Sequence, residues 1–188
     1  MSIKEVGYIS HQELIDAEQD ISAERYAKGP VAVIECVQEI PCNPCEDACK
    51  FGAIYVGSPI TNLPKIQEDN CTGCGACLAR CPGLAIFLVD KTYSETEATV
   101  AFPYEYVPTP EVGEEWEAVD RQGQVKCKGK IVKVMNPKAF DRTPIVTVAI
   151  PKEFADEVRS VKRKKKTVKE AKTWQELMMK CWFAVAKK

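Results

Sequence analysis

Four cysteines between residues 71 and 81 constrain this chain more than any other feature of its sequence. They are spaced C-x2-C-x2-C-x3-C and a proline follows: Cys71, Cys74, Cys77, Cys81 and Pro82. Thiolates at this spacing are ligands of iron–sulfur clusters, and the fourth cysteine of such a run ligates a different cluster from the other three. Gly73 and Gly75 have no Cβ, so the backbone can approach a cluster closely there. One such run therefore predicts a second.

A second, irregular run lies upstream. Its cysteines are spaced C-x5-C-x2-C-x3-C: Cys36, Cys42, Cys45 and Cys49. The last three keep the regular spacing, but Glu39 stands where the first cysteine is expected, and Lys50 replaces the proline. A short apolar segment follows each run, at residues 51–54 and 83–86. The two runs are therefore halves of an internal repeat with a period of about 32 to 35 residues.

Residues 31–90 resemble the bacterial dicluster ferredoxins, an α+β family that binds two [4Fe-4S] clusters. The resemblance rests on the two cysteine runs and covers about a third of the chain. Residues 53–56 and 63–67 are predicted to be short strands. Residues 31–34 would form an edge strand that pairs with the segment after the other cysteine run. The family's crossed ligation implies two ligand sets: Cys36, Cys42, Cys45 and Cys81 for the first cluster, and Cys49, Cys71, Cys74 and Cys77 for the second.

Alternative roles for the cysteines remain open at this point. If the displaced Cys36 does not reach the first cluster, a three-iron cluster or a Glu39 ligand would follow. Structural zinc joins two C-x2-C pairs about 15 to 20 residues apart, and the packed run at residues 71–81 does not match that. Disulfides need an oxidising compartment. Residues 1–20 are charged and lack the apolar core of a signal peptide, so we expect a reducing, cytoplasmic location.

Residues 91–160 predict a small, β-rich domain appended to the ferredoxin module, either a barrel or a sandwich. Its predicted strands lie at residues 98–102, 114–119, 124–135 and 144–150. Apolar positions change parity within the third of these strands, which indicates a bulge near residues 129–131. A short closing helix is predicted at residues 154–161. We expect Cys127 to be a core residue and not a ligand.

The two ends of the chain complete the predicted organisation. Residues 1–30 form an N-terminal extension in which Ser10 caps a short helix, and His11, the only histidine, is expected on the surface. Residues 161–188 combine a basic linker with an amphipathic helix, Trp174–Val185, whose apolar stripe can pack on its own domain or dock on another subunit. Residues 162–188 carry a net charge of +8, which leaves −9 for residues 1–161.

Several kinds of function are excluded by what the sequence lacks. It contains no glycine-rich dinucleotide or phosphate loop, and one histidine cannot supply a nucleophile–base set. No apolar run approaches the roughly 20 residues needed to span a bilayer. The basic run at residues 162–166 has no interleaved aromatic residue, so we do not expect nucleic acid as a partner. What remains is the storage and relay of single electrons.

A second, shorter resemblance suggests the setting of that relay. Residues 34–46 are similar to small iron–sulfur subunits that accompany FAD-dependent dehydrogenases of amino acids, amines or glycerol phosphate. It implies a flavoprotein partner that removes two electrons from a substrate, while this chain passes them on singly. The alternatives are a diffusible dicluster ferredoxin and an iron–sulfur protein that binds nucleic acid through its basic tail.

Overall fold

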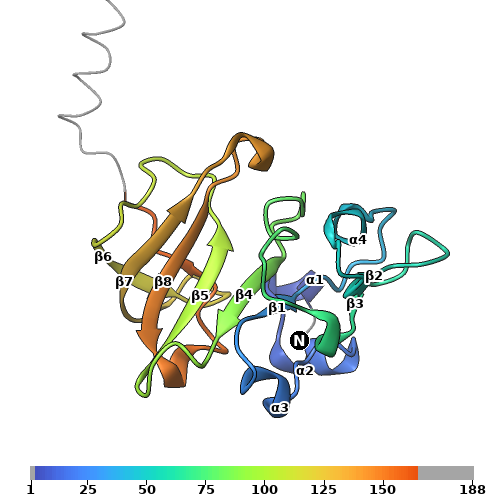
Figure 1. Cartoon of the computed structure of the whole chain (residues 1–188), viewed down its shortest axis with the longest axis horizontal. Helices are drawn as coiled ribbons and strands as arrows, with labels where there is room; N and C mark the ends of the chain where they lie inside the picture. Colours follow the sequence, from blue (N-terminus) through green and yellow to red (C-terminus); the bar gives the residue numbers. More distant parts are fainter. Residues whose placement is uncertain (1–2, 165–188) are drawn as a thin grey trace, which may run out of the picture.

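The computed structural model describes residues 3–164, and its main element is a seven-stranded antiparallel sheet (Figure 1). The order of the strands is β1-β4-β5-β8-β7-β6-β9. They span Val31–Ile34 (β1), Ile86–Asp90 (β4), Glu97–Pro103 (β5), Ile145–Pro151 (β8), Val125–Met135 (β7), Glu115–Val119 (β6) and Ser160–Val161 (β9). A separate two-stranded sheet pairs β2 (Ile54–Tyr55) with β3 (Lys65–Ile66). The short strands predicted on either side of the residue 57–59 turn are confirmed.

The described helices are short and belong to the N-terminal half of the chain. They are α1 (Ile3–Val6), α2 (His11–Asp16), α3 (Ala23–Tyr26) and α4 (Pro44–Ala48), and 3-10 turns lie at Glu68–Asn70, Lys138–Phe140 and Lys152–Phe154. The predicted cap of α2 is present, because the Glu13 N–H donates to Ser10 Oγ and the Ser10 N–H donates back to the Glu13 carboxylate. In Figure 1 these helices lie beyond the β1–β4 end of the large sheet, away from β6 and β7.

Both faces of the sheet are buried near β1, because side chains alternate between the faces of a strand. Val31 and Val33 point into one core, which we call the first core. It extends along the sheet as far as β9. Ala32 and Ile34 point into a second core, which contains Cys45 and Cys77 among other cysteines. All four residues of β1 are at most 4% exposed. β1 therefore separates the core of the β-rich part of the chain from the core that contains the cysteines.

The predicted pairing of residues 31–34 with the segment after the other cysteine run is confirmed. Val31 to Ile34 pair with Val89 to Ile86 in antiparallel register. In turn, β4 pairs with β5, with Leu88 opposite Ala101. One continuous sheet thus joins residues 31–90 to the β-rich segment.

The β-rich character of residues 91–160 is confirmed, but the described residues contain no closed barrel. The sheet is open because β1 at one edge and β9 at the other are not paired with each other in residues 3–164. The predicted bulge is present, as a shift in register between Ile131 and Lys133 in the pairing of β7 with β8. Cys127 packs against the first core, as expected.

The closing helix predicted at residues 154–161 is wrong. A 3-10 turn ends at Phe154, and Val161 lies in β9, where it pairs with Ala118 of β6. The prediction rested on the helical spacing of only three apolar residues. The edge of β6 has unpaired backbone hydrogen-bonding groups, and residues 160–161 pair with them as a strand. The predicted amphipathic helix Trp174–Val185 lies outside the described residues.

A buried ion cluster ties the end of β1 to the β-rich segment. The Glu35 carboxylate accepts hydrogen bonds from Arg121 Nε (2.8 Å) and Nη2 (2.6 Å), and from Arg159 Nε. The side chains of Glu35 and Arg159 are only 5% and 6% exposed. Burial by itself would raise the pKa of Glu35, but the two guanidinium groups hold this pKa below its ordinary value.

No helix within residues 3–164 is long and apolar enough to cross a bilayer.

Candidate iron–sulfur sites

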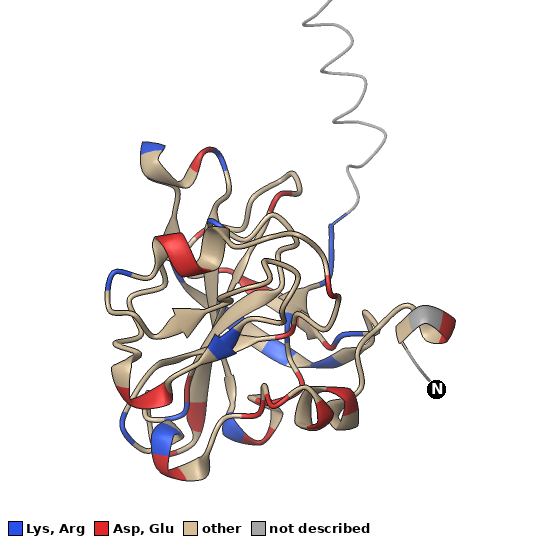
Figure 2. Cartoon of the chain, turned by 90° about the vertical axis from the view of Figure 1, so that its right-hand side faces the viewer, with Lys and Arg blue, Asp and Glu red and all other residues tan. Residues whose placement is uncertain are grey.

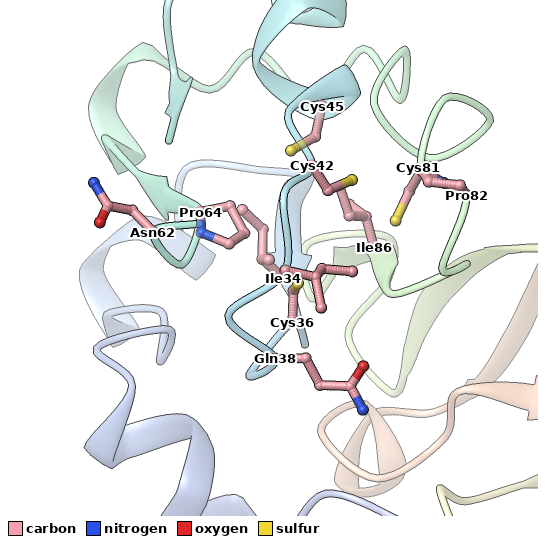
Figure 3. A pocket seen from close by; sticks show the side chains of 11 residues that line it. Ile34, Cys36, Gln38, Cys42, Cys45, Asn62, Pro64, Cys81, Pro82 and Ile86 are labelled. Carbon is pink, nitrogen blue, oxygen red and sulfur yellow. The ribbon is translucent and has the colours of Figure 1, made fainter. Parts of the chain in front are cut away.

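Four cysteines from three separate parts of the chain line one cavity (Figure 3). Cys36 follows β1, Cys42 lies two residues before α4 and Cys45 in its first turn, and Cys81 lies in the loop before β4. The rest of the lining is mostly apolar and includes Ile34, Pro64 and Ile86. The cavity, which we call the first cavity, encloses about 390 Å³ of space between atoms, including space open to solvent.

The other four cysteines of the two runs line a second cavity. Cys49 lies at the end of α4, and Cys71, Cys74 and Cys77 follow one another in the loop after β3. Cys77 is 7% exposed, whereas Cys74 is exposed to solvent. The structure therefore groups the eight cysteines four and four, in the same sets as the crossed ligation implies. Cys127, on β7, lines neither cavity.

The two cavities lie next to each other on one face of the β1–β4 pair. Ile34 and Ile86, which are partners in register, line the first cavity. Ala32 and Leu88, also partners in register, line the second cavity. Residues two apart along a strand are separated by about 7 Å. The register of this strand pair thus sets a short spacing between the two sites.

Backbone amides donate to cysteine sulfur at equivalent points of the internal repeat. The Ala53 N–H lies 3.2 Å from Cys49 Sγ, and the Ala85 N–H lies 3.4 Å from Cys81 Sγ. In both halves the donor is the fourth residue after the last cysteine of the run. A third such bond joins the Ala32 N–H of β1 to Cys71 Sγ at 3.5 Å. Hydrogen bonds to sulfur stabilise the thiolate form and tune the potential of a cluster.

The pKa values of the buried thiols bear on which bound group fits the two cavities. Burial, together with the neighbouring cysteines of the same cavity, raises the pKa of Cys45 to about 11 and that of Cys77 to about 12. Thiols with pKa values this high, such as Cys45 and Cys77, keep their protons at neutral pH unless a cationic centre beside them favours the thiolate. Thiolate sulfur is the donor that iron–sulfur clusters require. The donor sets therefore fit two clusters, one in each cavity.

No group of three or more His, Cys, Asp or Glu side chains in residues 3–164 is arranged to hold a single metal ion. The cysteine side chains are instead distributed around the walls of the two cavities, as Figure 3 shows for the first.

Comparison with known families agrees with this geometry. Residues 35–85 match the family described as the 4Fe-4S dicluster domain. This stretch is a 4Fe-4S dicluster domain. The match begins one residue before Cys36 and ends four residues after Cys81, so it includes all eight cysteines of the two cavities. The dicluster domain binds two [4Fe-4S] clusters.

The curated relatives that this chain matches are similar to it over about a quarter of its length. Over 49 residues the chain is 47% identical to a subunit of the ion-translocating oxidoreductase complex of Methanosarcina acetivorans, covering 26% of this chain and 17% of the relative. Over 51 residues it is 37% identical to the ferredoxin-type protein NapF of Escherichia coli, covering 26% and 31%. Over 47 residues it is 38% identical to a subunit of the Na(+)-translocating ferredoxin:NAD(+) oxidoreductase complex of Acetobacterium woodii, covering 25% and 14%. The chain thus spans less than a third of each relative. No solved structure matches it.

Within the dicluster domain, Glu39 and Cys36 occupy different places. Cys36 lines the first cavity with Cys42 and the other two cysteines. Glu39 is exposed and lines a separate, open hollow with Glu18 and Tyr55. The displaced cysteine is therefore better placed than Glu39 to meet a cluster in the first cavity.

Sequence analysis missed two residues that contact the cysteines, Gln19 and Arg25. Both belong to the N-terminal extension and are buried, and each bonds to the backbone of one cavity-lining cysteine. A lone glutamine or arginine in a polar segment has no spacing pattern that marks it.

Proposed function

We propose that this chain is an electron-transfer subunit that relays single electrons between a flavoprotein dehydrogenase and an acceptor. The observation that carries the proposal is the division of eight cysteines between two adjacent cavities on one strand pair. The proposed ligands are Cys36, Cys42, Cys45 and Cys81 for the first cluster and Cys49, Cys71, Cys74 and Cys77 for the second. When bound, such clusters take up and release one electron at a time.

The protein's own groups tune that chemistry by burial and by hydrogen bonding. Ile34, Ile86 and Pro64 keep water from one side of the first cavity, and a dry surrounding raises the influence of every nearby charge. The N–H groups of Ala53 and Ala85 donate to thiolate sulfur, which favours the more negative, reduced state of each cluster.

The route to a partner is proposed to pass through the exposed sides of the cavities. Cys74 of the second cavity is exposed, and Phe51, which lines the same cavity, is 52% exposed. Ile40, at the edge of the first cavity, is 49% exposed. Exposed apolar groups beside a redox centre allow a partner to approach closely and to exclude water. Residues 3–90 carry thirteen Asp or Glu and six Lys or Arg, a net charge of −7, so a basic partner surface would be attracted.

The proposed setting is a hetero-oligomer in the cytoplasm, and the hetero-oligomer has indirect support. The relatives of M. acetivorans and A. woodii are, by name, subunits of oxidoreductase complexes. The flavoprotein itself is inferred from the resemblance of residues 34–46 to small iron–sulfur subunits of FAD-dependent dehydrogenases. The helix expected at Trp174–Val185 is a candidate docking element on such a partner.

Nucleic-acid binding is less well supported, because the first basic residues of the tail already contact the β-rich segment. Lys162 Nζ lies 2.7 Å from a Glu117 carboxylate oxygen. Arg163 lies over the ring of Tyr106, and Lys164 Nζ lies 3.8 Å from the centre of the Trp116 ring. Figure 2 shows this basic stretch where the described chain ends.

The test is purification of the native protein under anaerobic conditions, with iron, sulfide and flavin counted on the recovered material. We expect stable flavoprotein partners and about eight irons per copy of this chain. A lone monomer with about eight irons would instead identify a diffusible ferredoxin. A flavin-free complex with nucleic acid that dissociates steeply with salt would favour a nucleic-acid-binding protein.

A further inference from the structure

The N-terminal extension buries two polar side chains against the dicluster domain. Within residues 3–164, five polar or charged residues are buried: Gln19, Arg25, Thr99, Thr143 and Arg159. Gln19 is 2% exposed and Arg25 is 5% exposed. Burial of such groups costs free energy unless they are fully hydrogen-bonded. Their partners therefore indicate what the extension does.

Gln19 bonds to both backbone polar groups of Cys36. The Cys36 N–H donates to Gln19 Oε1 at 3.1 Å, and Gln19 Nε2 donates to the Cys36 carbonyl at 2.6 Å. The same Nε2 group also donates to the Pro64 carbonyl at 3.2 Å. One side chain thus connects Cys36 to the loop that leads into β3.

Cys36 needs such a partner because of its position. It follows β1, and the last described backbone bond of this strand to its neighbour is from the Glu35 N–H to the Ala85 carbonyl, at 2.8 Å. Cys36 also lies six residues before Cys42, whereas the equivalent Cys71 lies only three residues before Cys74. The longer loop therefore constrains Cys36 less than the short loop constrains Cys71.

Arg25 makes the corresponding contacts at the second cavity. Its Nη2 donates to the Cys71 carbonyl at 2.6 Å and to the Pro30 carbonyl at 2.8 Å. Its Nε donates to the Glu68 carbonyl at 2.9 Å, and its Nη1 to the Gly29 carbonyl at 3.1 Å. The rigid fork of a guanidinium suits this arrangement, since one planar group satisfies four carbonyls. The residue before β1 and the first cysteine of the second run are thereby held together.

The same end of the extension packs closely on the cysteine loop. A Cβ on Gly73 would lie 2.6 Å from the Pro30 carbonyl oxygen, so only glycine fits between the two segments. Gly73 also has a φ of +68°, which glycine adopts without strain. The close contact between Pro30 and the cysteine loop therefore requires glycine at position 73.

We propose that residues 3–30 form a clamp in which Gln19 positions Cys36 for the first cluster and Arg25 positions Cys71 for the second. The inference rests on the ligand sets of the proposed function. Neither residue touches a cluster directly, so both are positioning residues. Because they act on different cavities, their effects on the two clusters are separable.

The experiment compares Gln19→Met and Arg25→Gln in the full-length chain, purified anaerobically, by iron and sulfide counts, electron paramagnetic resonance and reduction potential. Cys36→Ser and Cys71→Ser supply the reference spectra for damage to the first and second cluster. Gln12→Ala and Lys28→Met serve as controls, because the described side-chain bonds of these exposed residues go only to Asp16 and Asp69.

We expect Gln19→Met to change the first cluster alone, with iron falling from about eight to about seven or four per chain and a spectrum like that of Cys36→Ser. We expect Arg25→Gln to change the second cluster alone, with a spectrum like that of Cys71→Ser. An Arg25→Lys variant keeps the positive charge but loses the planar guanidinium that bonds to four carbonyls. Compared with Arg25→Gln, it should restore the reduction potential of the second cluster more than its iron content.

The clamp is refuted if both variants keep about eight irons and wild-type spectra and potentials while Cys36→Ser and Cys71→Ser do not. Loss of both clusters in each variant would also refute it, since the residues would then support the fold as a whole. If the wild-type protein itself holds fewer than about eight irons, or if the serine variants lose none, the ligand sets of the proposed function fail instead.

Discussion

Replacement of Glu35 by glutamine tests how strongly the ion cluster holds the β-rich segment to the dicluster domain. In the wild-type protein the carboxylate accepts three hydrogen bonds from two guanidinium groups. The neutral amide leaves Arg121 and Arg159 facing each other without a counter-charge, and the Arg159 side chain is 6% exposed. Removal of one partner from a buried ion pair costs about 3–5 kcal/mol, because the remaining charge stays desolvated.

A loss of this size is readily measured. For a chain of this length, each kcal/mol changes the melting temperature by about 2–4 °C, so we expect Glu35→Gln to melt about 10 °C lower. Circular dichroism during heating, at a matched rate and without oxygen, would follow the transition. Iron must be counted beforehand, so that proteins with equal cluster content are compared.

Two variants give this prediction its controls. Glu117→Gln breaks an exposed pair with Lys162, in which both side chains are about half exposed, so its cost should stay below about 1 kcal/mol. Arg121→Leu leaves Glu35 paired with Arg159 and should be milder than Glu35→Gln. If Glu35→Gln melts within a degree or two of Glu117→Gln, the ion cluster does not stabilise the fold and the reasoning fails.

Three further predictions concern the clusters. Cys36→Ser should lower the iron count to about seven or four per chain, whereas Cys127→Ser should leave about eight; an iron count unchanged by the first substitution would remove Cys36 from the ligand set. Gly73→Ala should destabilise the second cluster to chelators much more than Gly57→Ala, because both glycines have positive φ but only Gly73 lies against Pro30; equal chelation rates would contradict this. Removal of iron with a chelator should leave most of the far-ultraviolet β signal, because the core on the other face of β1 is built almost wholly without cysteine; complete loss of that signal would show that the sheet depends on the clusters.

The dicluster domain could be predicted from the sequence because its chemistry is local. Three ligands of each run fall within eight residues of chain, and the short apolar run at residues 31–34 predicts a strand that pairs with the segment after the other cysteine run. The bulge in β7 was also predictable, since a change of parity along a strand needs an extra residue somewhere in its pairing.

The positioning groups could not be predicted, because they bond to backbone. Gln19 and Arg25 recognise carbonyl and amide groups that every residue possesses, so no side-chain pattern marks their partners. The ion cluster of Glu35 could not be predicted for a different reason: its two arginines lie 86 and 124 residues away along the chain.

The cluster chemistry, the internal repeat and the position of most strands can be predicted from the amino-acid sequence, because each depends on spacings of a few residues. Three features follow only from the tertiary structure. The strands before and after residue 90 form one open sheet, β9 pairs with β6 where a helix was predicted, and the N-terminal extension packs on the cysteines. These outcomes depend on which backbone groups remain unpaired after the local elements have formed. Such groups are satisfied by whichever distant segment the fold brings to them.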